Sequence, residues 1–184
     1  MNKMEIPLKD SPVASPGVPV YLISTISKDG TKNIAPYGMV MPVSYNPPTY
    51  VVGSDKDRDT YRNVMDTEEF VLNVPSASML EKVNLTAVKF PAKIDEFEKA
   101  KFTPMPAFQV KVPLIAECRC HFECKLLNIY EINKTRLVII GEVISVSIDR
   151  ELYLKDFAKQ KGQLDPLFYA HGAYFGLGRY VGKR

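Results

Sequence analysis

The segment from Thr49 to Asn63, TYVVGSDKDRDTYRN, decides how the rest of the chain is interpreted. Residues 49–52 have the β-branched and aromatic character of a strand, and residues 60–66 can start a helix. A strand that breaks at Gly53-Ser54 and restarts as a helix leaves backbone N–H groups without partners, and such groups can bind phosphate. Lys56 and Arg58 add positive charge beside them. The segment therefore predicts an anion-binding loop.

The same residues fit two other interpretations. In a plain polar turn, Asp59 or Thr60 would cap the helix, and on these residues alone such a turn is the more common case. Asp55, Asp57 and Asp59 also alternate as in a calcium-binding EF-hand loop. That loop requires glycine at its sixth position and glutamate at its twelfth, where this chain has Thr60 and Asp66. Calcium is therefore excluded, whereas the polar turn stays open beside the anion loop.

The composition limits the class of protein. The chain has 184 residues, of which 46% are hydrophobic and 24% charged, with a net charge of +3. These values are typical of one globular domain, which we expect over residues 1–184, and the charge is too small to indicate nucleic acid as a partner. There is no apolar run of the roughly 18 residues that a membrane span needs, and residues 1–18 hold no signal-like apolar segment. We expect a cytoplasmic protein with a small-molecule partner.

Strand patterns outnumber helical ones. Segments with the composition of strands are residues 20–26, 31–37, 39–45, 49–53, 69–74, 116–126 and 136–149. Helical patterns cover residues 60–66, 76–88 and 151–162. We expect residues 1–18 to form an extended lead-in, and residues 88–106 to form a surface loop with a turn of helix near 95–101. This order, without regular strand-helix alternation, predicts a mostly β barrel with a few peripheral helices.

The most regular alternation lies in residues 116–126. Cys118, Cys120 and Cys124 share the phase that we expect to face the core, and His121 and Glu123 share the phase that we expect to face water. Because no fourth ligand stands at a suitable spacing, we interpret the cysteines as buried apolar residues and expect no metal site.

No familiar catalytic motif is present. The chain lacks a Gly-x-Ser-x-Gly elbow, a Walker loop and a Gly-x-Gly-x-x-Gly turn, which argues against hydrolase, P-loop and Rossmann proteins. His171 has no identifiable partner, so we interpret it first as a packed or hydrogen-bonded residue. Gly141 interrupts an apolar strand and predicts a bulge or a close approach of another element. The catalytic residues stay unknown at this point.

Several segments in a fixed order resemble a known family. They are Thr25–Gly30, Asn33–Tyr37, Val43–Pro48, Arg58-Asp59-Thr60 with Asn63, and Glu69–Asn73. Together they resemble the flavin reductase-like family of FMN-binding split barrels, in particular its flavoredoxin-type branch, over about residues 15–150. The resemblance implies a split β-barrel of Greek-key type that binds FMN at a homodimer interface.

The resemblance also implies a function and a set of binding residues. Members of the family pass hydride from NADH or NADPH to the flavin, so we expect an FMN-dependent oxidoreductase that delivers electrons to a small-molecule or protein acceptor. The positions matching those that line the isoalloxazine ring are Asn33, Ala35, Pro36, Tyr37, Gly38 and Met39. Those matching the surroundings of the ribityl phosphate are Ser54, Arg58, Asp59, Thr60 and Asn63. His171 is a candidate for the nicotinamide or acceptor side.

The sequence departs from the family pattern at one position, and two alternative functions stay open. Many relatives have serine where this chain has Gly38, so a hydroxyl near the ring is missing here and a backbone amide could take its place. One alternative is an FMN-binding electron carrier or flavin store without reductase turnover. The other is a flavin-free barrel that kept only the fold. The sequence does not distinguish NADH from NADPH, and it does not identify the acceptor.

Overall fold

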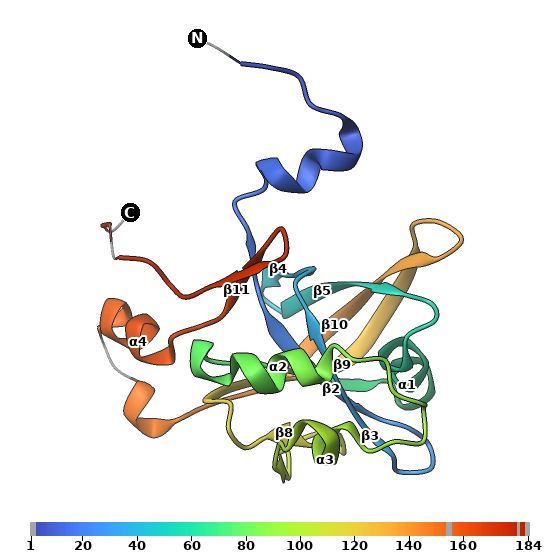
Figure 1. Cartoon of the computed structure of the whole chain (residues 1–184). Coiled ribbons are helices and arrows are strands. Elements are labelled where there is room, and N and C mark those ends of the chain that lie inside the picture. Colours follow the sequence, from blue (N-terminus) through green and yellow to red (C-terminus); the bar gives the residue numbers. More distant parts are fainter. Residues whose placement is uncertain (1–2, 154–155, 180, 183–184) are drawn as a thin grey trace.

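The computed structural model describes residues 3–153, 156–179 and 181–182 of the chain (Figure 1). Its strands are β1 (Val18–Pro19), β2 (Tyr21–Ile26), β3 (Lys32–Tyr37), β4 (Val40–Tyr45), β5 (Pro48–Asp55), β6 (Glu69–Asn73), β7 (Pro104–Met105), β8 (Leu114–Ile115), β9 (Cys120–Glu131), β10 (Arg136–Ile148), β11 (Phe168–Ala170) and β12 (Ala173–Phe175). Its helices are α1 (Asp59–Thr67), α2 (Leu80–Thr86), α3 (Glu96–Ala100) and α4 (Phe157–Leu164). Short 3₁₀ turns cover η1 (Leu8–Ala14), η2 (Ala77–Met79) and η3 (Arg150–Leu152).

One antiparallel sheet forms the body of the molecule. Its seven strands run in the order β3-β2-β6-β9-β10-β5-β4. The two edge strands, β3 and β4, follow each other in the chain and are joined by Gly38-Met39, so the two ends of the sheet meet at this link. The sheet therefore curls into a split barrel, which confirms the predicted fold class.

The interior of the barrel is apolar. Ile23, Val52, Phe70, Leu137 and Ile139, all buried, belong to one cluster contributed by strands from both halves of the sheet. Burial of each such side chain contributes about 1.5–3 kcal/mol, so this cluster is a main source of stability. A β-carbon added at Gly141 would lie 2.3 Å from the ring of Phe70, and the β9–β10 register shifts at this position. The predicted bulge and close approach at Gly141 are both confirmed.

A second apolar layer covers the outside of the sheet. Helices α2 and α3 lie across β2 and β3 (Figure 1), where Val83 and Phe97 pack with Leu22 and Ile34. Residues 88–95 form the first part of the predicted surface loop, but Phe97, Ala100 and Phe102 are buried, so the second part of residues 88–106 packs against the sheet instead of crossing the surface. The helical turn expected near residues 95–101 is present as α3. The expected lead-in of residues 1–18 likewise contains structure, namely η1 and the short strand β1.

The strand β9 departs from its predicted alternation. His121 is 3% exposed and Glu123 is 0% exposed, so the phase that we expected to face water is buried in the first half of the strand. The Glu123 carboxylate accepts hydrogen bonds from the amides of Phe108, Gln109 and Val110. A chain segment thus covers this face and gives the buried carboxylate the donors that it needs.

The three cysteines are buried and free, as predicted. They do not share one core. Cys124 lies in the barrel interior, Cys118 packs beneath α2 and α3, and Cys120 contacts a small cluster with Leu152 and Leu164.

Candidate functional site

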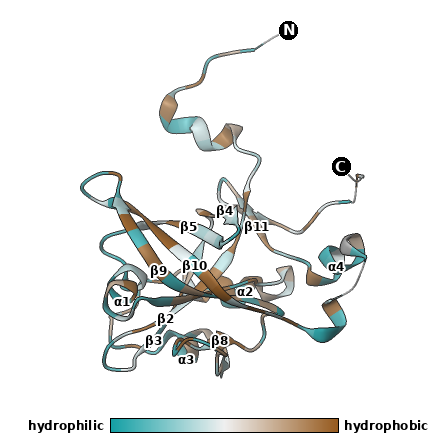
Figure 2. Cartoon of the chain, turned by 180° about the vertical axis from the view of Figure 1, so that it is seen from behind, coloured by the Kyte–Doolittle hydropathy of each residue, from teal (hydrophilic) through white to brown (hydrophobic). Residues whose placement is uncertain are grey.

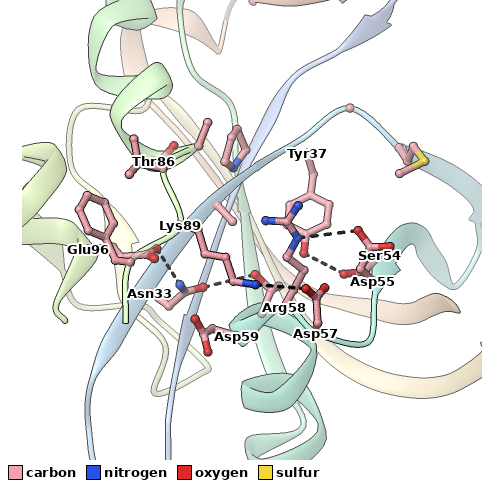
Figure 3. A pocket seen from close by; sticks show the side chains of 18 of the residues that line it. Asn33, Tyr37, Ser54, Asp55, Asp57, Arg58, Asp59, Thr86, Lys89 and Glu96 are labelled. Atoms are coloured by element: carbon pink, nitrogen blue, oxygen red, sulfur yellow. Dashed lines mark hydrogen bonds and ion pairs between the residues drawn. The ribbon is translucent and has the colours of Figure 1, made fainter. Parts of the chain in front are cut away.

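A cavity of about 290 Å³ opens where β3, β5 and the start of α1 meet the segment that follows α2 (Figure 3). Its lining divides into two walls. The strand wall consists of residues 33–39 and 53–60 that face the cavity, and the helix wall consists of residues 86–90 and Glu96. Arg136, on β10, lies at the edge of the cavity beside the strand wall. The volume is near the lower end of the range for small-molecule sites.

The N-terminus of α1 points to this cavity without a cap. Arg58 is the N-cap residue with extended backbone, and no side chain of the described chain accepts a hydrogen bond from the first amides of the helix. Asp59 pairs with Arg62, and the Thr60 hydroxyl donates to Asn33 Oδ1 over 3.3 Å. The polar-turn interpretation, in which Asp59 or Thr60 caps α1, is therefore wrong. The free amides and the helix dipole favour an anion here.

Three cationic side chains surround the uncapped helix end. Arg136 Nε lies 2.8 Å from Asp55 Oδ1, and Arg58 Nε lies 3.8 Å from Asp55 Oδ2. Lys89, from the helix wall, reaches Asp57 with Nζ 3.2 Å from Oδ2, and its charge and hydrogen bond lower the pKa of that carboxyl. The three cations are about half exposed or more, although Asp55 is only 22% exposed, so each pair contributes little to stability and can exchange its partner for a ligand.

The rest of the strand wall offers small residues and backbone. The link Gly38-Met39 between the two edge strands lines the cavity beside Ala35 and Pro36. A β-carbon at Gly38 would lie 2.8 Å from Cγ2 of Val18, so β1 leaves no room for the serine that the resemblance predicts at this position. The absence of a side chain at Gly38 lets Val18 of β1 pack closely against the backbone.

A buried hydrogen-bond network supports the strand wall. Tyr37 Oη lies 2.8 Å from Ser54 Oγ and ties β3 to β5, and burial raises the pKa of Tyr37. On the other side of β3, Asn33 Oδ1 accepts from the hydroxyls of Thr25 and Thr60. Asn63 is buried and donates its amide to Thr25 Oγ1 over 3.0 Å.

The structure brings most of the predicted site residues together. Of the positions proposed from the sequence, those that line the cavity are Asn33, Ala35, Pro36, Tyr37, Gly38, Met39, Ser54, Arg58, Asp59 and Thr60. Asn63 does not line it and instead supports the network behind Asn33 and Thr60.

The sequence interpretation missed the helix wall and Arg136. Thr86 was expected only as part of a helix, and Lys89, Phe90 and Glu96 were expected in a surface loop, yet all four line the cavity. The one local signal was charge, because Lys89 is a single cation in an apolar stretch after a predicted helix. Nothing in the sequence around Arg136 indicated that it would lie at the site. It is placed by antiparallel register, which sets it opposite Asp55.

Other candidate residues lie elsewhere. His171 is exposed in the turn between β11 and β12, with a left-handed backbone at φ 44°, so it is not the packed residue that we expected. It does not line the cavity. Within the described ranges, no three histidine, cysteine or acidic side chains come together as a possible metal site. None of the helices in those ranges has the length and apolar character needed to cross a membrane.

Comparison with known proteins identifies the class. The flavin reductase like domain model matches residues 15–178. A protein from Methanothermobacter thermautotrophicus is 44% identical over 139 residues, which is 74% of this chain and 66% of that protein. A protein from Aquifex aeolicus is 35% identical over 165 residues, which is 85% of this chain and 82% of that protein.

Solved structures show the same fold. Nitrilotriacetate monooxygenase component B from Bacillus cereus has a TM-score of 0.86 at 27% identity, covering 100% of this chain and 97% of that one. Flavoredoxin from Methanosarcina acetivorans has a TM-score of 0.85 at 25% identity, covering 100% and 95%. The chain belongs to the flavin reductase-like domain family, and its class is that of the flavin-related oxidoreductases.

Proposed function

We propose that the protein binds FMN in this cavity and passes electrons from NADH or NADPH through the flavin to an acceptor. The observation that carries the proposal is the uncapped N-terminus of α1, with Arg58, Lys89 and Arg136 beside it in one cavity. This donor set fits a phosphate monoester, because dianionic oxygens are stabilised by charge-assisted hydrogen bonds and helix amides.

Each part of the cavity has a task in this proposal. The amides of α1, with Arg58 and Lys89, would hold the phosphate. The small side chain of Ala35 and the backbone of the Gly38-Met39 link would let the isoalloxazine ring lie against the strand wall. When bound, the flavin supplies the redox chemistry, so the protein needs no general acid or base of its own and mainly positions donor and cofactor.

Two measurements test this proposal. Titration of the purified protein with FMN, FAD and riboflavin, followed by fluorescence quenching, is expected to show the tightest binding for FMN. Anaerobic addition of NADH or NADPH to the FMN-loaded protein is expected to bleach the flavin absorbance within seconds. Binding without bleaching would support the electron carrier or flavin store instead. A protein that takes up no flavin would overturn the proposal.

We further propose that the protein acts as a homodimer. Exposed apolar side chains follow strands that are close neighbours in the sheet, and Figure 2 shows hydrophobic colour along much of β9 and β10. Met41 is 58% exposed and Tyr45 is 85% exposed on β4, and Leu127, Tyr130 and Val146 are exposed on β9 and β10. Apolar patches of this kind mark interaction surfaces.

The oligomeric state is measured by light scattering after gel filtration. We expect twice the chain mass of 20.7 kDa. Replacing Met41 and Tyr45 together by Lys is expected to give monomers, because charges in a desolvated interface lose hydration without a partner. A wild-type monomer at tens of micromolar would contradict the dimer.

A further inference from the structure

Glu96 is a buried carboxylate of the helix wall that no part of the proposed function has used. It is the first residue of α3 and is 6% exposed. Its Oε2 accepts a hydrogen bond from Asn33 Nδ2 over 2.6 Å (Figure 3). The same oxygen accepts a second hydrogen bond from the amide of Ile34 over 2.9 Å. Through Asn33 it is linked to Thr60, at the start of α1.

Glu96 lines the cavity, and its second oxygen, Oε1, is the atom that could contact a ligand there. Oε1 makes no hydrogen bond within the described chain. Every side-chain oxygen or nitrogen of the described residues that is fully buried does have a hydrogen-bond partner. Oε1 is therefore not sealed from solvent, and because Glu96 lines the cavity, the opening is the cavity itself. A ligand in this cavity meets an oxygen that the protein leaves without a partner.

No cation of the described chain neutralises this carboxylate. Lys32 on β3 pairs with Asp95, Lys89 on the helix wall pairs with Asp57, and Arg62 on α1 pairs with Asp59. Burial, with smaller contributions from the charges of Asp59 and Asp95, raises the pKa of Glu96 to about 7, against the lowering effect of the Ile34 amide.

The charge of the whole lining favours a proton on Glu96 when an anion is bound. The cationic side chains are Arg58, Lys89 and Arg136, and the acidic ones are Asp55, Asp57, Asp59 and Glu96. With Glu96 ionised, the acids exceed the cations by one, and with Glu96 protonated the two are equal. A phosphate placed in the cavity adds negative charge and so stabilises the protonated carboxyl.

We propose that Glu96 is a ligand-binding residue that is protonated in the complex and donates a hydrogen bond from Oε1 to an oxygen of the bound flavin nucleotide. This inference rests on the proposed function. The proton comes from solvent, and up to one is taken up for each ligand bound. The acceptor oxygen belongs to the phosphate or to a hydroxyl of the ribityl chain.

The sign of the pH dependence follows from linkage. Above the pKa of free Glu96, near 7, binding requires proton uptake, so affinity falls as pH rises, by up to about tenfold per pH unit. Below that pH the carboxyl is already protonated and its contribution becomes flat. The phosphate of FMN, with a second pKa of about 6, is fully charged above pH 7.5 and adds little to this slope.

The experiment is isothermal titration of the wild-type protein with FMN between pH 6.5 and 8.5, in two buffers of different ionisation enthalpy. We expect uptake approaching one proton per FMN at pH 8. The variant Glu96→Gln keeps both accepted hydrogen bonds and imitates the protonated form. We expect it to bind FMN roughly tenfold more tightly than wild type at pH 8, with little proton uptake.

A matched control and a second ligand sharpen the result. Glu98→Gln removes the same charge from an exposed position of α3, outside the cavity, and is expected to keep the wild-type pH slope. Riboflavin, which lacks the phosphate, shows which ligand oxygen accepts the hydrogen bond from Glu96. A retained slope places it on the ribityl chain, and a lost slope places it on the phosphate.

The outcomes separate this inference from the function on which it rests. If wild type binds FMN but shows the same slope and proton uptake as Glu96→Gln, the inference is wrong and FMN binding stands. Weaker binding by Glu96→Gln, with no proton uptake by wild type, would make Glu96 an ionised acceptor and also overturn it. If wild type binds no FMN even at pH 6.5, the proposed function fails and the inference falls with it.

Thermal unfolding of the ligand-free proteins checks that the variant is folded. Because the pKa of Glu96 is raised in the folded state, its contribution to the stability of wild type declines as pH rises from about 4.5 to about 7. Glu96→Gln should unfold at a temperature less dependent on pH over this interval.

Discussion

The two walls of the cavity are built in different ways. The strand wall comes from β3, β5 and the start of α1, and most of it lies within residues 53–60, one short stretch of chain. The helix wall comes from the end of α2 and the start of α3, which reach the cavity because their apolar residues pack on the outside of the sheet. A site can thus be half encoded in a local motif and half supplied by packing.

The two walls also differ in charge. The strand wall presents free amides and Arg58, which suit an anion, and its three aspartates, Asp55, Asp57 and Asp59, are each paired with a cation. The helix wall presents Lys89 and the buried carboxyl of Glu96, one favourable to an anion and one unfavourable until protonated. If the proposed function is right, the strand wall should dominate affinity and the helix wall should modulate it.

The largest effect is expected from the strand wall. Replacing Arg58 and Thr60 together by Ala removes a cation and a hydroxyl at the start of α1 and should weaken FMN binding about a hundredfold. Fluorescence titration measures the change. Lys56→Ala is the control, because Lys56 pairs with Glu131 and does not line the cavity. Unchanged affinity in the double variant would place the phosphate elsewhere.

A smaller effect is expected from the helix wall. Lys89→Met removes the one cation that this wall contributes to the cavity lining and should raise the dissociation constant of FMN about tenfold. The difference from wild type should shrink in high salt, because ionic screening weakens the lost contact. Lys93→Met removes an equal charge from an exposed position outside the lining and should bind like wild type. If Lys89→Met weakened FMN binding as much as the Arg58 and Thr60 double variant does, the two walls would contribute equally to affinity and the comparison would be wrong.

The smallest effect concerns the link between the edge strands. Gly38→Ser restores the residue expected from the resemblance, but its β-carbon would meet Val18, so the free energy of unfolding should fall by about 1 kcal/mol. Urea denaturation measures this change. Adding Val18→Ala should recover most of the loss by making room for the hydroxymethyl group. Equal losses with and without Val18→Ala would show that β1 is not what keeps residue 38 a glycine.

The predictable parts of the molecule are those whose signal is local. The hairpin of β2 and β3 and the pairing of β9 with β10 follow from turn residues and short-range patterns. The change from strand to helix was also predicted, but β5 continues through Gly53-Ser54 to Asp55, so the break lies two residues later than expected. The close contact at Gly141 was also predictable, because a glycine inside an apolar strand often marks a bulge or the close approach of another element.

Other predictions were wrong because the local sequence pattern around some polar residues suggests exposure to water. His121 and Glu123 belong to a regular alternation that normally faces water. They are buried because residues 107–118 fold over that face and supply donors and acceptors, including the carbonyl of Ile115 for His121. Glu96 is similar, since nothing near it in the sequence indicates that Asn33 will be its partner.

The sequence by itself determined a mostly β barrel, the strand-to-helix break that leaves amides free, and the family to which the ordered segments belong. Only the tertiary structure decided that α1 has no cap, that Lys89 and Arg136 join Arg58, and that the buried side chain of Glu96 lines the same cavity. Turn and strand preferences act between residues a few positions apart. Contacts such as that between Asn33 and Glu96, 63 residues apart in the chain, exist only after the sheet has closed and the helices have packed on it.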